Sequence, residues 1–231
     1  RGLSRAESMS FVSMTRAGGE ALLSAVKAVA PGYPLRGRLR IAPALNTPDG
    51  VGLLWAARRM DTPFRERVAG QELVDRICAL AAERGDAARI FLLGAREGIA
   101  ELAGIKLKEK YPSLKIAGCY AGSPSAEEDQ RITEQINESG ARILFVAYGP
   151  PKQELWIARN APRLKNIAVA MGVGGTFDTL AGIVPRAPKW MRDTGFEWTY
   201  RLIREPRRIK RQMSIPYFMW LMAKSGSRRV E

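Results

Sequence analysis

The chain has 231 residues, of which 46% are hydrophobic, and it carries a formal net charge of +14 with two cysteines and no histidine. This length fits one large domain or one domain with an appendage, and the apolar content suffices for a buried core, so a disordered chain is not expected. The lack of histidine excludes a Ser-His-Asp triad and leaves acid–base chemistry to carboxylates. Two cysteines are too few for a disulfide framework, which favours a protein of the reducing cytoplasm.

Strands and helices are predicted to alternate along most of the chain. Helical patterns cover 20–29, 51–60, 71–84, 97–111, 125–138 and 152–163, and strands are expected at 40–44, 89–93, 114–117, 143–147 and 167–171. This order predicts an α/β fold with a Rossmann-like, doubly wound, mostly parallel sheet. Basic and aromatic residues take over after Pro185, so we predict an α/β domain over 1–190 and a basic, amphipathic, helical C-terminal appendage over 191–231.

Two of the predicted strands deliver polar residues where they end. The apolar runs 143–147 and 167–171 have the composition of buried parallel strands, and each breaks at a glycine. Ligands bind at the carboxyl ends of the strands in an open parallel sheet. The residues that follow hold one cation, one amide and two carboxylates: Lys152, Gln153, Glu154 and Asp178. This set suits a phosphorylated, hydroxyl-rich ligand.

Further turns have two interpretations each. Asp49 either caps the helix predicted at 51–60 or acts as a general base, and Arg67 is either a solvated loop charge or a fork for a phosphate or carboxylate. The turn 94–98 has the geometry of a phosphate or nucleoside cradle but lacks the G-x-G-x-x-G spacing, which disfavours a nicotinamide cofactor. The turn 172–175 is either a tight turn or a close backbone approach to a ligand. No D-x-D or His/Cys cluster is present, so neither a metal nor another cofactor is expected.

The C-terminal segment concentrates positive charge beside apolar residues. Residues 186–231 contain twelve Lys and Arg against four Asp and Glu, with Trp, Tyr and Phe among them. This composition fits either a helix pair packed on the core with a solvated basic face or an interfacial membrane segment, which we favour. No apolar run reaches the ~18 residues of a membrane span. No nucleic-acid-binding motif appears, so nucleic acid is not the expected partner.

Seven ordered motifs together resemble the WecG/TagA/CpsF family of bacterial glycosyltransferases, from about residue 41 to about residue 213. They are Pro48-Asp-Gly50, Glu66-Arg-Val-Ala-Gly70, Phe91-Leu-Leu-Gly94, Phe145-Val-Ala-Tyr-Gly-Pro-Pro-Lys-Gln-Glu154, Gly172-Val-Gly-Gly-Thr-Phe-Asp178, Arg186-Ala-Pro-Lys-Trp190 and Glu197-Trp-Thr-Tyr-Arg-Leu-Ile-Arg-Glu-Pro206.

The resemblance implies an inverting, metal-independent transfer of an N-acetylmannosamine-like sugar or another hexose. The donor is a UDP-sugar and the acceptor a polyprenyl-diphosphate-linked sugar, as in teichoic acid or exopolysaccharide synthesis. The enzyme would be cytoplasmic and peripheral, on the anionic inner face of the bacterial cytoplasmic membrane. Self-association is left open.

The resemblance also implies roles for individual residues. Asp49 is the candidate base, Arg67 and Gln153 line the sugar and diphosphate region, and Arg201, Arg208 and Arg211 meet the pyrophosphate. The further candidates for substrate binding are Thr15, Asn46, Gly94, Tyr148, Gly149, Lys152, Glu154, Gly172, Gly174, Gly175, Thr176 and Asp178.

The chain departs from the family pattern at three places. A Thr-Pro-Asn motif is absent near Thr15, and the start of the domain is diverged or truncated. Residues 118–123 carry no histidine where many members have two, and Tyr148 replaces an aliphatic residue. These departures leave the donor sugar open. The alternative is a non-catalytic basic module that binds a sugar nucleotide or nucleic acid.

Overall fold

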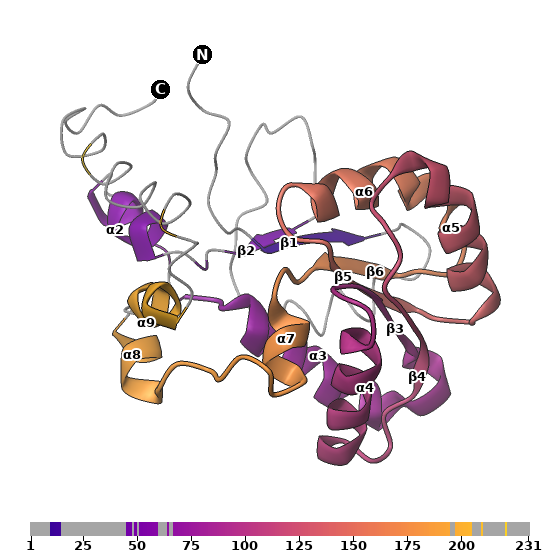
Figure 1. Ribbon diagram of the computed structural model, residues 1–231, viewed down its shortest axis with the longest axis horizontal. Coiled ribbons are helices and arrows are strands. Elements are labelled where there is room, and N and C mark those ends of the chain that lie inside the picture. The colour runs from indigo at the N-terminus through magenta and orange to yellow at the C-terminus, as the bar shows by residue number, and fades with distance from the viewer. Residues whose placement is uncertain are drawn as a thin grey trace. The chain divides into compact units, whose positions relative to one another are not determined.

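The structure, a computed structural model, describes residues 10–14, 45–47, 49, 51–59, 64, 67–194, 197–204, 209 and 220 (Figure 1). The chain divides into two compact units. The sheet unit comprises Ser10–Thr47 and Val68–Val184, and the split unit comprises Arg1–Met9, Pro48–Arg67 and Pro185–Glu231. The segment 48–67, which carries two of the predicted site residues, therefore groups with the C-terminal residues. The predicted division at residue 190 stays a prediction.

The sheet unit is built on a six-stranded sheet in the order β2-β1-β6-β5-β3-β4. Four neighbouring strands are parallel: β3 (Ile90–Gly94), β4 (Ile116–Tyr120), β5 (Ile143–Ala147) and β6 (Val169–Gly172). All residues of β3, β5 and β6 are buried, as their apolar runs predict. The α/β fold with a mostly parallel sheet is thus confirmed.

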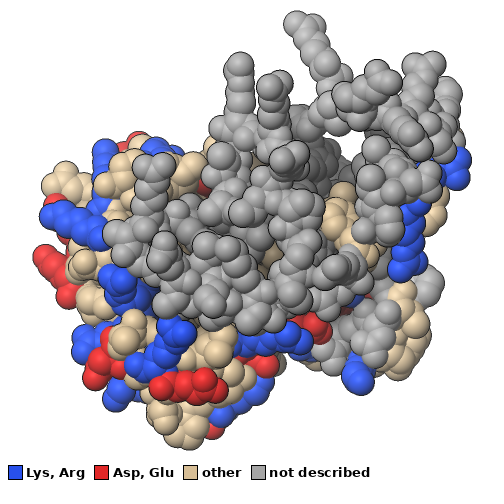
Figure 2. Space-filling view, turned by 180° about the vertical axis from the view of Figure 1, so that it is seen from behind, with Lys and Arg blue, Asp and Glu red and all other residues tan. Residues whose placement is uncertain are grey.

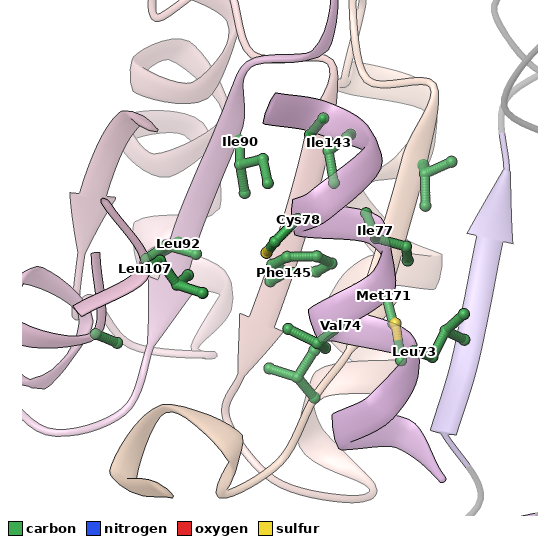
Figure 3. Packing of buried hydrophobic residues seen from close by; sticks show 14 of the residues in the cluster. Leu73, Val74, Ile77, Cys78, Ile90, Leu92, Leu107, Ile143, Phe145 and Met171 are labelled. Atoms are coloured by element: carbon green, nitrogen blue, oxygen red, sulfur yellow. The ribbon is translucent and has the colours of Figure 1, made fainter. Parts of the chain in front are cut away.

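Helices cover both faces of this sheet. On one face lie α3 (Gly70–Arg84), α4 (Ile99–Lys110) and α7 (Thr176–Leu180), and on the other lie α5 (Asp129–Glu138) and α6 (Lys152–Asn160). Because side chains alternate along a strand, Ile90 and Leu92 of β3 join the first layer, and Phe91 and Leu93 join the second. Figure 3 shows α3 packed through Leu73, Val74, Ile77 and Cys78 against strand residues of the first layer. Short 3₁₀ turns at Gly85–Ala88, Ala126–Glu128 and Ala161–Arg163 complete the connections.

The edge of the sheet differs from the prediction. No strand is predicted before residue 40, but β1 (Ser10–Met14) is a strand that pairs antiparallel with both β6 and β2 (Leu45–Thr47). The strand expected at 40–44 lies outside the described residues, and β2 begins directly after it, at Leu45. A five-residue strand has little local signal, and its pairing partner β6 is more than 150 residues away. The helix predicted at 20–29 also lies outside the described residues.

The described helices of the split unit are α2 (Val51–Arg59), α8 (Lys189–Asp193) and α9 (Glu197–Arg204). The side chains of Trp190 and Ile203 are among its exposed large hydrophobics. Within the described ranges, no helix has both the length and the apolar character required to cross a membrane.

Candidate functional site

Gln153 joins the two turns that follow β5 and β6. Its side-chain oxygen accepts hydrogen bonds from the backbone N–H of Gly149 at 3.1 Å and of Gly174 at 2.9 Å. Its amide nitrogen donates to Glu154 Oε1 at 2.8 Å, and the residue is only 3% exposed. Gln153 stands at the start of α6, directly after the β5 turn, which brings it to the carboxyl edge of the sheet. The amide therefore ties together the two turns predicted to contact a ligand.

The glycines of this edge are required by space and by backbone conformation. A Cβ at Gly172 would lie 2.5 Å from Gln153 Nε2, so only glycine leaves room for the buried amide. Gly149 and Gly174 have φ values of 76° and 54°, a region that side-chain-bearing residues rarely adopt. Gly94 combines a φ of 99° with a position where a Cβ would lie 2.9 Å from the carbonyl carbon of Ala147. The β3 turn thus packs directly against the end of β5.

A second polar contact links the turn after β3 with α7. Arg96 Nη2 donates to Asp178 Oδ1 at 3.3 Å, and the Asp178 side chain is 25% exposed. Thr176 is buried and its hydroxyl donates to the carbonyl of Val173 at 2.6 Å, which closes the turn at the start of α7. Lys152 is exposed at the start of α6, whereas Glu154 is buried. This edge therefore presents exposed cations, glycine backbone and one half-buried carboxylate.

Tyr148 is half-buried beside the same turn. Its ring contacts that of Trp156 edge-to-face, with centroids 6.2 Å apart. Its hydroxyl is shielded from solvent and has no hydrogen-bond partner among the described residues. Burial raises the pKa of this phenol, with smaller contributions from the charges of Glu128 and Asp129 and from Tyr120. Tyr148 thus packs as a neutral aromatic side chain.

In the split unit, Arg67 lies between two carboxylates. Its Nε donates to the backbone oxygen of Asp49 at 2.8 Å, and its Nη2 donates to Asp49 Oδ1 at 3.0 Å and to Glu197 Oε2 at 3.4 Å. Burial alone would lower the pKa of Arg67, but attraction and hydrogen bonding to Asp49, and less so to Glu197, outweigh it and raise the pKa. The guanidinium therefore stays charged and contacts both carboxylates.

The structure brings together some of the predicted residues. Asp49 pairs with Arg67 in the split unit, and Gln153 gathers the β5 and β6 turns in the sheet unit. Thr15, Arg208 and Arg211 lie outside the described residues. Asn46 and Arg201 are placed in β2 and α9 by their backbone alone.

Two residues of these clusters were not predicted. Glu197 opens one of the quoted motifs, and Arg96 lies within the quoted turn 94–98, but neither was named as a site residue. A helix that begins with a carboxylate has an ordinary local explanation, so no sequence signal distinguished Glu197. Among the described residues, no group of three or more His, Cys, Asp or Glu could hold a metal ion. The expected lack of a cofactor stays a prediction.

Comparison with known proteins gives two findings. The family model described as "Glycosyl transferase WecG/TagA/CpsF family" matches residues 38–231. The chain is also 36% identical over 171 residues to the N-acetylglucosaminyldiphosphoundecaprenol N-acetyl-beta-D-mannosaminyltransferase of Bacillus subtilis (strain 168). That alignment covers 74% of this chain and 65% of the relative, so the chain spans just under two thirds of the length of that curated protein.

Proposed function

Because the chain belongs to the WecG/TagA/CpsF glycosyltransferase family, we propose that it transfers a sugar from a UDP-sugar to a polyprenyl-diphosphate-linked sugar. The relative's name describes transfer of N-acetylmannosamine to a lipid diphosphate that bears N-acetylglucosamine. A sugar of that class is the first donor to test, and bacterial cell-surface polysaccharide synthesis is the proposed setting.

The observation that carries this proposal is the pairing of Asp49 with Arg67. A sugar hydroxyl that attacks an anomeric carbon needs a base to take its proton, and a departing diphosphate needs cations. Asp49 is the proposed base, and its side chain is 21% exposed, so it keeps access to an acceptor hydroxyl. Arg67 donates a hydrogen bond to this carboxylate at 3.0 Å and supplies positive charge beside it. Direct displacement by this hydroxyl inverts the anomeric centre and needs no metal ion.

The sheet unit offers the surface for the nucleotide sugar. The turns after β3, β5 and β6 place the backbone of Gly94, Gly149 and Gly174 at one edge, where ligands of open parallel sheets bind. Gln153 holds the second and third of these turns together from below the surface. Asp178 and Arg96 add polar groups for ribose hydroxyls and phosphates.

The C-terminal helices support an association with a lipid surface. Trp190 is 63% exposed and Ile203 75% exposed, and basic residues surround them in the sequence. Apolar side chains beside Lys and Arg are typical of segments that lie in the headgroup region of anionic membranes. Arg201, Arg208 and Arg211 of this segment are proposed to meet the pyrophosphate groups of the substrates.

The alternative proposal, a non-catalytic basic module, receives less support. On the left part of the face shown in Figure 2, Lys and Arg are interspersed with Asp and Glu. Recognition of nucleic acid instead relies on a basic patch or stripe. Binding to liposomes and to single- and double-stranded nucleic acid at matched salt separates the two proposals.

The test is release of UDP from a panel of UDP-sugars, with and without a polyprenyl-diphosphate-N-acetylglucosamine analogue in liposomes. We expect release with one donor, dependent on the acceptor and insensitive to a chelator, and a product of inverted anomeric configuration. Absence of release with every donor, from a protein shown to be folded, would contradict the proposal and favour the binding module.

A further inference from the structure

Glu197 is a carboxylate of the C-terminal helices that contacts the candidate base through one shared cation. It lies in the first turn of α9, and its Oε2 is 3.4 Å from Arg67 Nη2, the same atom that is 3.0 Å from Asp49 Oδ1. The three side chains come from segments separated by 18 and 130 residues in the sequence. One guanidinium nitrogen therefore connects the loop before α2 with α9.

The burial of Glu197 argues against a solvated charge. Its side chain is 13% exposed, compared with 21% for Asp49 and 24% for Arg67. A carboxylate that only stabilised the start of α9 would gain nothing from burial, because burial removes its hydration. The ion pair with Arg67 compensates part of this loss. The contact thus orients Glu197 toward Arg67.

We propose that Glu197 is a positioning residue that holds Arg67 against Asp49 and so links the seating of α9 to the geometry of the candidate base. Asp49 anchors the guanidinium through Nε and one side of Nη2, and Glu197 anchors the same nitrogen from α9. When α9 is not seated, Arg67 loses this second anchor and gains side-chain freedom. The consequence for turnover rests on the proposed function, whereas the contact itself does not.

The competing interpretation is that Glu197 acts on α9 alone. A negative charge in the first turn of a helix interacts favourably with the helix dipole. That effect involves no other side chain, so it would persist after Arg67 is removed. The two interpretations therefore differ in whether changes at positions 67 and 197 are additive.

A double-mutant cycle read by hydrogen–deuterium exchange decides between them without any need for activity. The variants are Glu197→Ala, Arg67→Ala and the double variant, with exchange followed in peptides that cover 197–204. We expect each single change to speed exchange of α9 by about two- to fivefold, as for a partly exposed ion pair, and the double change to add nothing further. Glu109→Ala is the control, because it removes an ion-paired carboxylate that is 57% exposed on α4 of the sheet unit.

Unchanged exchange in Glu197→Ala would overturn the proposal, and so would an effect of Glu197→Ala that Arg67→Ala does not share.

With an active protein, the same double-mutant cycle is repeated with turnover as the readout. We expect Glu197→Ala to lower kcat about tenfold with KM for the donor within about twofold, and to have no effect once position 67 carries alanine. Glu197→Gln, which keeps the length and an acceptor oxygen, should retain more of kcat than Glu197→Ala. If no donor is turned over, the proposed function fails while the exchange cycle still decides the contact.

Discussion

The buried side chain of Gln153 needs the space that Gly172, which has no side chain, leaves free. The Gln153 amide occupies the space beside Gly172 and fastens the turns after β5 and β6. We predict that Gly172→Ala and Gln153→Ala each destabilise the sheet unit, and that the double variant is much more stable than the sum of the two effects implies. The reason is that the methyl group added at position 172 enters space that the Gln153→Ala change has already vacated.

The structure sets the magnitudes. Gln153→Ala leaves two backbone N–H groups without their acceptor and removes one hydrogen bond to Glu154, which costs about 2–4 kcal/mol in all. Gly172→Ala places a Cβ 2.5 Å from Nε2 and 2.8 Å from Cδ of Gln153, so the amide must move. Overpacking together with the loss of those hydrogen bonds costs about 2–4 kcal/mol. In the Gln153→Ala background, the cost of Gly172→Ala should fall below about 1 kcal/mol, so the coupling is about 2 kcal/mol.

The assay is urea unfolding followed by far-UV circular dichroism for the two single variants, the double variant and the parent protein. Gln130→Ala is the matched control, because this glutamine is exposed on α5 and its side chain bonds to Glu134 on the same helix, so the change should cost less than about 0.5 kcal/mol. Additive effects of the two changes would refute the reasoning. They would mean that the amide does not fill the space beside Gly172.

Three other predictions concern the candidate base, a buried carboxylate and the C-terminal helices. Asp49→Asn keeps the size of the side chain but removes the proposed base, so kcat should fall by about 100-fold or more in the UDP-release assay; unchanged turnover at saturating substrate would remove that role. Asp129 is buried, which alone would raise its pKa, but hydrogen bonds from Arg159 and Asn160 outweigh this and lower the pKa. The stabilising contribution of Asp129 is thus present above the unfolded-state pKa of about 4 and is lost as the pH falls through the lower folded-state pKa. Asp129→Asn should therefore lower the free energy of unfolding by about 1–3 kcal/mol at pH 7 and by less near pH 3. Equal losses at both pH values would contradict this assignment. Ile203→Glu on α9 should weaken binding to anionic liposomes about tenfold in a liposome-pelleting assay. The control is Ile105→Glu, which changes an isoleucine that is 55% exposed on α4 and should leave binding unchanged. Equal effects of the two changes would locate the membrane contact elsewhere.

Sequence alone was sufficient for the parallel core and for the position of the glycine-rich turns at one edge of the sheet. The runs that became β5 and β6 are continuous and apolar, a local pattern typical of a strand buried on both faces. The glycine-rich turns that follow them had to lie at one edge, because neighbouring parallel strands end on the same side. The motifs also predict Asp49, Arg67 and Gln153 as site residues, and these roles stay predictions.

The tertiary structure decided what these residues do to one another. The sequence offered Gln153 as a ligand contact, but the fold buries its amide between the backbones of Gly149 and Gly174. The sequence left two interpretations for Asp49, a helix cap or a base, and two for Arg67, a solvated charge or a ligand of a phosphate or carboxylate. In the fold the two residues form an ion pair. Glu197, which is 130 residues from Arg67 in the sequence, contacts this pair only because the chain is folded. Periodicity reports the local burial of each segment, whereas contacts between distant segments depend on the path of the whole chain, which no local pattern encodes.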